Sequence, residues 1–227
     1  MKITVIHGQS HKGSTYNIAK RLCDKLGGEV MEFFLPRDFD CFCQGCTACF
    51  FKETGCPDYG KLKPITTALD EADVIILASP VYVMHATGAM KSLLDHYGYR
   101  FMVHRPEEKM FSKQAVCIAT AAGAGMRSTI KDMADSTFFW GCARTYKLGI
   151  AVMETRWDHV KPGIKNKIDK KTTALAKKIS TRVGKVKPTI ITKTFFTMMS
   201  LMQRKGFNEA DVSYWKEKGW TSGKRPW

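Results

Sequence analysis

The chain has 227 residues, enough for one α/β domain with an appendage and for a core that needs no disulfides. Lys2 and a short apolar strand open it, no small-residue cleavage site follows, and no apolar run approaches the roughly 18 to 20 residues that cross a bilayer. From these features we expect no signal peptide and no spanning helix, and we predict a soluble cytoplasmic protein. Eight cysteines in such a protein are typical of thiols or metal ligands rather than disulfides.

The formal charge of +15 is unevenly distributed. Residues 160–227 contain 17 Lys and Arg against 4 Asp and Glu, whereas residues 1–159 contain 19 against 17. A solvated basic helix face would explain this excess, and an anionic membrane surface or an acidic protein partner is the alternative. Nucleic-acid binding is not expected, because the chain has no zinc-finger, RRM or helix-turn-helix pattern.

Short apolar runs alternate with helical segments along the chain. The runs predict strands at Ile3–His7, Val30–Leu35, Val74–Ala78, Ala115–Ala119 and Tyr146–Val152. Helices are predicted at Ser14–Leu26, Lys61–Ala72, Ala89–Tyr97, Ser128–Trp140 and Ile164–Val183. Strands that are apolar throughout indicate a sheet covered on both faces. Because right-handed crossovers join such strands, the sequence predicts a doubly wound parallel sheet.

A loop rich in Gly, Ser and Thr follows the first predicted strand. Such a loop before a helix offers backbone N–H groups, hydroxyls and a favourable helix dipole, which together suit a phosphate. The alternative is an ordinary N-capped helix after a turn. His11 is interpreted as a solvated loop histidine. The predicted phosphate ligands are Ser10, Lys12, Gly13, Ser14, Thr15 and Asn17.

The loops after the third and fourth predicted strands favour a flat ring. Pro and Tyr in the first of them suit an aromatic system better than a phosphate, and small residues in the next leave room beside it. Phosphate at one strand end and a planar ring at its neighbour suggest flavin mononucleotide (FMN). The predicted ring contacts are Pro80, Val81, Tyr82, Val83, Met84, Thr120, Ala121, Ala122, Gly123 and Gly125.

Taken together, these segments resemble the flavodoxin-fold NAD(P)H-dependent FMN reductases, a group that includes the iron-sulfur flavoproteins. The residues that match are the loop 10–15, Ser79-Pro-Val-Tyr82 with Gly88, Lys91 and Asp95, and Thr120–Gly125, within residues 1–155. His11 and Lys12 stand where family members often have Pro-Arg. Lys91 and Asp95 are interpreted as an i,i+4 ion pair of the helix that carries them.

The resemblance implies a flavodoxin-like, five-stranded parallel sheet of order 2-1-3-4-5, whose switch point brings the first two loops together. It also implies an oxidoreductase in which NAD(P)H reduces bound FMN, which then reduces a quinone, flavin, nitro or azo compound. No catalytic acid, base or nucleophile is expected, because the flavin carries the chemistry. A homodimer is expected, since a second subunit often completes such sites.

A cysteine-rich insertion occupies residues 41–60, with the spacing Cys43-x2-Cys46-x2-Cys49-x6-Cys56 and Cys41 as an extra thiol. It resembles the motif of iron-sulfur flavoproteins, in which four thiolates hold a [4Fe–4S] cluster. It also resembles the Cys-x-Gly-Cys-x-x-Cys segment of many FMN reductases that carry no cluster. A metal-free thiol loop is favoured, and a cluster or a zinc site stay open as alternatives. With a cluster, the protein would be an electron carrier between a ferredoxin-type partner and FMN. Core positions are expected for Cys23, Cys117 and Cys142.

Lys187-Pro188 breaks the chain after the fifth predicted helix. We therefore predict a flavodoxin-like domain at residues 1–187 and a basic C-terminal docking extension at 188–227. A further helix is predicted at Ile190–Lys205, and its apolar stripe would pack on the core or a second subunit, or else lie on a membrane. The stripe consists of Ile191, Phe195, Met198, Met199 and Met202, and the expected packing anchors are Trp215, Trp220 and Trp227.

Overall fold

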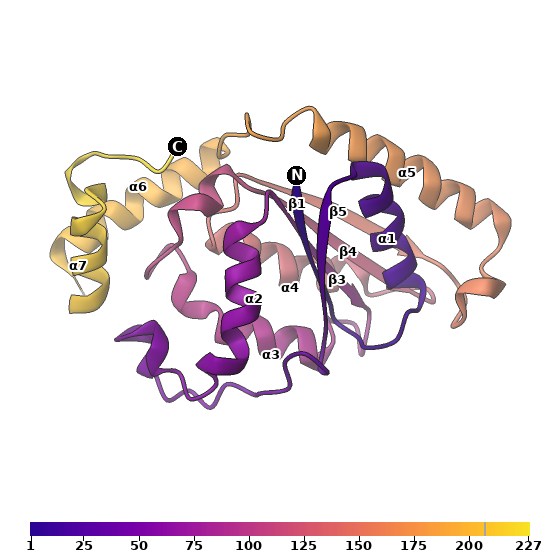
Figure 1. Cartoon of the computed structure of the whole chain (residues 1–227), viewed down its shortest axis with the longest axis horizontal. Helices are drawn as coiled ribbons and strands as arrows, with labels where there is room; N and C mark the ends of the chain where they lie inside the picture. Colours follow the sequence, from indigo (N-terminus) through magenta and orange to yellow (C-terminus); the bar gives the residue numbers. More distant parts are fainter. Residues whose placement is uncertain (207) are drawn as a thin grey trace.

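Five parallel strands form the centre of the molecule in a computed structural model that describes residues 1–206 and 208–227. The strand order β2-β1-β3-β4-β5 confirms the predicted flavodoxin-like topology (Figure 1). Predicted and observed strand ends differ by at most two residues, as is usual for element boundaries. The strands are β1 (Lys2–His7), β2 (Glu29–Phe34), β3 (Val74–Pro80), β4 (Gln114–Ala121) and β5 (Arg144–Ala151).

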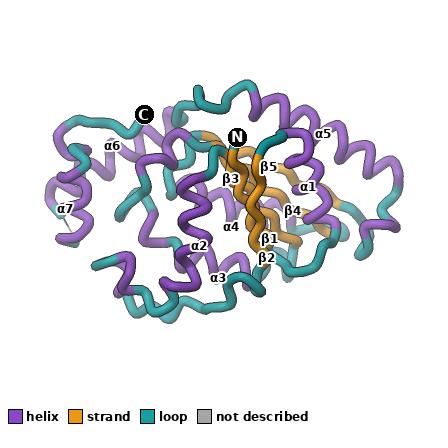
Figure 2. The backbone as a smooth tube through the Cα atoms, in the orientation of Figure 1, coloured by secondary structure: helices purple, strands orange, loops and turns teal. Residues whose placement is uncertain are grey.

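Helices cover both faces of this sheet, so the strands lie in the middle layer (Figure 2). Successive side chains of a strand point to opposite faces. Val74 and Ile76 accordingly pack under α1 (Ser14–Leu26) and α5 (Pro162–Ser180). Ile75 and Leu77 pack under the helices of the other face. Those helices are α2 (Tyr59–Glu71), α3 (Gly88–His96) and α4 (Met126–Phe139).

The C-terminal extension forms two helices, α6 (Ile190–Lys205) and α7 (Glu209–Glu217), at the far end of the molecule from α1 and α5 (Figure 1). Its large side chains pack together with buried residues of the preceding part of the chain and form a core cluster separate from the two beneath the sheet helices. The extension therefore packs on the core. Trp215 and Trp220 are packing anchors, as expected. The fully buried members of this cluster include Met102, Phe111, Phe196, Trp215 and Trp220.

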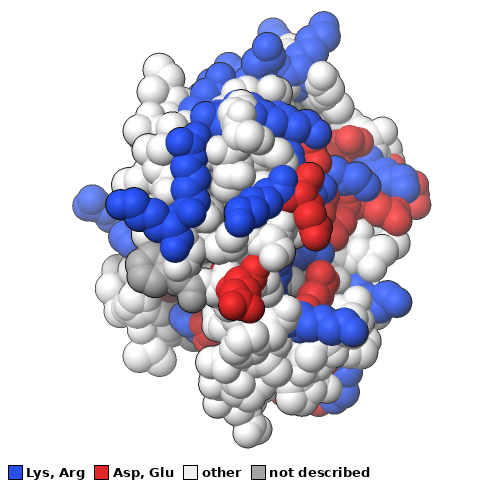
Figure 3. All heavy atoms as spheres, turned by 90° about the vertical axis from the view of Figure 1, so that its left-hand side faces the viewer, with Lys and Arg blue, Asp and Glu red and all other residues white. Residues whose placement is uncertain are grey.

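The predicted stripe of α6 is only partly buried. The inward face is centred on Phe196 and Met199, whereas Ile191, Met198 and Met202 remain exposed. Lys and Arg side chains gather over the upper half of this end of the molecule, and uncharged residues lie between them (Figure 3). Among the described residues, none of the helices combines the length and apolar character needed to cross a membrane. The division of the chain at residue 187 stays a prediction.

Replacing Trp215 by alanine tests how firmly the extension is joined to the core. Because the ring is fully buried, the free energy of unfolding should fall by about 3 to 5 kcal/mol. Urea denaturation followed by circular dichroism measures this change. Ile191→Ala is the control, since that side chain is exposed, and should cost no more than about 0.5 kcal/mol. A Trp215→Ala change as small as the control's would mean that the extension docks only loosely.

Candidate functional site

The loops that follow β1 and β3 meet at the switch point of the sheet. The amide of Gly8 donates to the Ala78 carbonyl at 2.8 Å, and the Thr87 hydroxyl donates to the Gly8 carbonyl at 2.7 Å. A Cβ at Gly8 would lie 2.9 Å from the Thr87 hydroxyl oxygen, so this approach requires glycine. Sequence reasoning missed Thr87, which is the N-cap because α3 begins at Gly88, one residue before the predicted start at Ala89. Its hydroxyl does cap α3, by accepting from the Met90 amide.

The N-terminus of α1 is open to an anion. Its N-cap is Gly13, which offers no capping side chain, and the first turn carries no acidic residue. The helix therefore presents free backbone N–H groups at its positive end. The Ser14 hydroxyl is buried there and has no hydrogen-bond partner among the described residues. Because such burial costs about 1 to 3 kcal/mol, this hydroxyl fits a bound phosphate oxygen.

In contrast to Ser14, the side chains of the other predicted phosphate ligands have partners within the protein. The Thr15 and Thr120 hydroxyl oxygens lie 2.5 Å apart and join the loop after β1 (the first loop) to the loop after β4 (the third loop). The Asn17 amide donates to the Gly13 carbonyl at 2.9 Å, so it fastens the loop. The Ser10 hydroxyl donates to the Leu35 carbonyl at 3.2 Å, which leaves its oxygen free to accept. Finally, the Lys12 ammonium lies 5.2 Å from the centre of the Tyr16 ring.

The loop after β3 (the second loop) contains a strained turn at Tyr82–His85. Tyr82 and His85 exchange backbone hydrogen bonds of 2.9 and 3.0 Å, and Val83 and Met84 between them have φ angles of 47° and 68°. Such a turn favours Asn and Gly, whereas a β-branched valine in it is a conformational outlier. Strain of this kind clusters at ligand sites. Val83 is also 96% exposed, so packing against the described residues does not explain an apolar side chain here.

Gly125 lets the third loop pack on the second. Its φ angle is 88°, and a Cβ there would lie 2.5 Å from the Val81 side chain. The Ser128 hydroxyl donates to the Met84 carbonyl and fixes the strained turn from α4. Ala121 is partly buried, while Ala122 and Gly123 are exposed at the rim. The structure thus brings the predicted phosphate and ring residues to one edge of the sheet.

Lys91 and Asp95 lie on α3, directly after the loop that follows β3. They form the expected i,i+4 ion pair on the exposed side of α3. Their interpretation as a helix-stabilising pair is therefore confirmed.

A second candidate site lies at the other end of α3, which is about 13 Å long at 1.5 Å per residue. Four of the five cysteines of the cysteine segment (residues 41–60) line a cavity of about 250 Å³ together with His96 and Tyr99. Burial raises the pKa of Cys49, and the nearby charges of Cys56, Cys43 and Cys46 raise it further. Four thiolates are thus costly here without a cation, and metal binding would have to release their protons. The four thiols that line the cavity belong to Cys43, Cys46, Cys49 and Cys56.

The same cavity offers a different ligand set. One ligand atom each from Cys56, Asp58 and His96 lies within 4.8 Å of the others. The second ring nitrogen of His96 lies 2.9 Å from the Ser92 carbonyl, an arrangement that orients metal-binding histidines. This geometry keeps zinc open as an occupant. By contrast, Cys23, Cys117 and Cys142 are buried in the core, as expected, and burial raises the pKa of each thiol to about 12.

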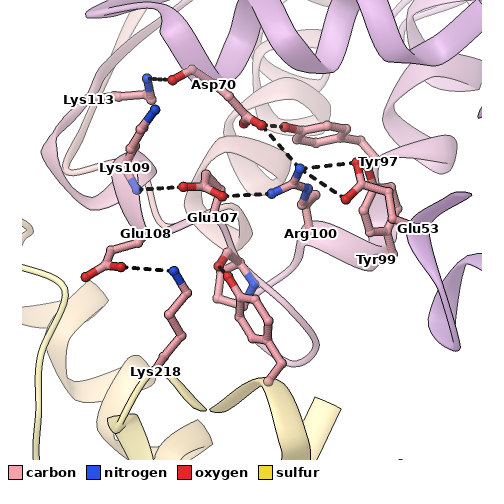
Figure 4. A network of polar contacts seen from close by, with 12 residues as sticks. Glu53, Asp70, Tyr97, Tyr99, Arg100, Glu107, Glu108, Lys109, Lys113 and Lys218 are labelled. Carbon is pink, nitrogen blue, oxygen red and sulfur yellow. Dashed lines mark hydrogen bonds and ion pairs between the residues drawn. The ribbon is translucent and has the colours of Figure 1, made fainter. Parts of the chain in front are cut away.

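Arg100 fastens the cysteine segment to the domain and was not singled out in the sequence. Its guanidinium lies 3.2 Å from carboxylate oxygens of Glu53, Asp70 and Glu107 (Figure 4). The Tyr99 hydroxyl adds a 2.8 Å bond to Glu53. Because Arg100 is only 11% exposed, removing it would leave three carboxylates without their shared cation.

Comparison with known proteins identifies the family of the chain. The family described as NADPH-dependent FMN reductase matches residues 1–154. An iron-sulfur flavoprotein of Archaeoglobus fulgidus is 28% identical over 239 aligned residues, which cover 96% of this chain and 99% of that protein. An iron-sulfur flavoprotein of Methanocaldococcus jannaschii is 32% identical over 98 residues, so this chain spans half of its length.

Two solved structures share the fold at low sequence identity. An azoreductase from Bacillus anthracis has a TM-score of 0.62 at 11% identity, with 78% of this chain and 99% of that chain covered. An NAD(P)H:quinone oxidoreductase from Methanothermobacter marburgensis has a TM-score of 0.62 at 13% identity, with coverages of 79% and 96%. With the family matching residues 1–154 and the flavodoxin-like sheet in place, the chain belongs to the NADPH-dependent FMN reductase family and is an FMN-dependent oxidoreductase.

Proposed function

We propose that the protein takes electrons from NADH or NADPH and passes them through FMN to a small acceptor. Quinones, free flavins, nitro compounds and azo compounds are the acceptor classes that we propose. The observation that carries this proposal is the buried Ser14 hydroxyl at the open N-terminus of α1, beside two loops that suit a ring.

The proposed division of labour follows from the contacts. The amides of α1 and the hydroxyls of Ser14, Thr15 and Ser10 would hold the phosphate, and Lys12 would add charge. The backbone of residues 80–84 and of residues 120–125 would hold the edges of the ring. FMN supplies the redox chemistry when bound, by accepting a hydride from the nicotinamide and giving two electrons to the acceptor. The protein's task is to orient the ring and to leave one side of it accessible.

The homodimer expected from the sequence also remains a proposal. Tyr82, Val83 and Met84 are exposed apolar residues beside the proposed ring site. A second copy packed over them would shield both the strained turn and one edge of the ring. We therefore propose this loop as the dimer surface.

The phosphate site can be tested by replacing Ser14 and Thr15 together with alanine. Hydrogen bonds to a charged group contribute about 1.5 to 3 kcal/mol each, so FMN should bind roughly a hundredfold more weakly or worse. Fluorescence titration of the flavin measures the dissociation constant. The neighbouring pair Ser180 and Thr181, exposed at the end of α5, gives a matched double-alanine control. Equal affinity in both double variants would place the phosphate elsewhere, and FAD as the flavin released by heating would overturn the single-phosphate site.

Turnover tests the direction of electron flow. With FMN bound, NADH or NADPH should bleach the flavin absorbance anaerobically, and a quinone should restore it. Stopped-flow absorbance follows both halves of the cycle. If neither nucleotide reduces the flavin while a reduced ferredoxin does, the electron-carrier function replaces this one.

An electron carrier with a [4Fe–4S] cluster is the second candidate function. Four thiols lining one cavity of about 250 Å³ favour it, because the ligand set of such a cluster is four thiolates. The chain would hold the cluster through Cys43, Cys46, Cys49 and Cys56, at the opposite end of α3 from the flavin loops. The metal-free thiol loop and the zinc site remain the competing occupancies.

Iron analysis separates these occupancies. A cluster predicts about four iron and four sulfide per chain after anaerobic purification, with broad visible absorbance. Cys46→Ser should abolish most of the iron, because it removes one of the four ligands. Cys46 is exposed, so the substitution should leave the core intact. Cys41→Ser should retain it, because that thiol lies outside the set of four. Stoichiometric zinc, or the absence of metal in the wild type, would remove the cluster from the proposal.

A further inference from the structure

A largely buried arginine joins the C-terminal extension to the cysteine segment. The Arg105 guanidinium donates to the carbonyl oxygens of Cys49 and Phe50, the latter at 2.7 Å. The same guanidinium lies 2.7 Å from a carboxylate oxygen of Asp211 on α7. The side chain of Arg105 is 12% exposed and that of Asp211 is 3% exposed, so little water competes for this ion pair.

Asp211 is the centre of the arrangement. Its second oxygen lies 2.8 Å from a ring nitrogen of His104, and the His104 ring packs on Phe50 at 4.4 Å between centres. Asn208, the N-cap of α7, donates to the Phe50 carbonyl at 3.2 Å. Three side chains thus connect one short helix to the same two residues of the cysteine segment.

The cysteine segment needs this support because it has little structure of its own. Only two short 3-10 turns, Ala48–Phe50 and Glu53–Gly55, occur between its first and last cysteines, and neither has a buried residue. Arg100 holds the second turn through Glu53 (Figure 4). Arg105 holds the first turn, which carries Cys49. Arg100 and Arg105 lie in the same segment between α3 and β4. Asp211 of α7 fixes the position of Arg105.

We propose that α7 is a positioning element for the cysteine cavity. Asp211, acting through Arg105, His104 and the loop that carries them, holds the backbone of Cys49 and thereby sets where its thiol points. The cavity itself is part of the second candidate function, but the positioning role concerns this chain's own residues and holds whatever occupies the cavity. The extension is then a support for a functional loop, a role distinct from the docking role expected from the sequence.

Thiol labelling of the full-length, reduced, metal-free protein tests the proposal. Iodoacetamide modification of each cysteine is timed by mass spectrometry. In the wild type Cys49 should react more slowly than the exposed Cys43 and Cys46. In Asp211→Asn the rate at Cys49 should rise tenfold or more, because a neutral amide cannot hold the buried guanidinium. Arg105→Lys is the second variant and should act in the same direction, since one ammonium cannot replace the planar fork.

Two internal controls separate positioning from general stability. Glu209→Gln changes an exposed carboxylate of the same helix and should leave every rate unchanged. The core thiols of Cys117 and Cys142 should stay protected in all variants that bind FMN. A Cys49 rate within twofold of wild type in both Asp211→Asn and Arg105→Lys would overturn the proposal. So would a parallel rise at Cys117 and Cys142, because it would mark Asp211 as a residue of overall stability.

Iron retention gives a separate readout. After anaerobic reconstitution with iron and sulfide, a chelator should remove iron at least tenfold faster from Asp211→Asn than from the wild type or Glu209→Gln. If the wild type takes up no iron, the cluster proposal is contradicted. The positioning role of α7 is then decided by the labelling rates. Equal iron loss in all three proteins, with iron bound, would overturn the positioning role.

Discussion

The pairing of β1 with β3 is the constraint on which the proposed flavin site depends. These strands are distant in sequence, yet their carboxyl ends must lie side by side for a phosphate loop and a ring loop to serve one ligand. Gly8 permits the approach, and the hydroxyl of Thr87 closes it with a bond to the Gly8 carbonyl. Because both strands are buried on both faces, a shift in their register would expose apolar side chains. The core therefore fixes the geometry of the site.

The two candidate sites are held in place by different interactions. The proposed flavin edge rests on the sheet and offers backbone amides, a glycine turn and a few hydroxyls. The cysteine cavity rests on irregular backbone, which must be held by side chains from elsewhere. Arg100 and Arg105 do so as buried cations with carboxylate partners. Buried pairs of this kind add little net stability, but loss of one partner is costly, which makes them suited to fixing position.

Strain and exposure collect where the proposed ligands would bind. Val83 and Met84 adopt left-handed backbone in a turn that glycine would fit more easily, and the Ser14 hydroxyl is buried without a partner among the described residues. Each feature costs stability in the absence of a ligand. The large apolar clusters beneath the loops, and the tryptophans of the extension, supply the stability that tolerates them.

The sequence by itself determined the strands, the first six long helices, the three loops and the family, because each is a local signal. An apolar run predicts a buried strand, a Gly- and Ser-rich loop predicts an anion site, and the Lys91–Asp95 spacing predicts an ion pair within one helix. Tertiary structure decided the rest. Nothing local marked α7, whose apolar periodicity is weak, or the face of α6 that would be buried, since that choice depends on Met102 and Phe111 elsewhere. Thr15 meets Thr120, and Arg105 meets Asp211, across about a hundred residues. Such pairs are set only when the chain folds, because the burial that makes them strong does not exist before the core forms.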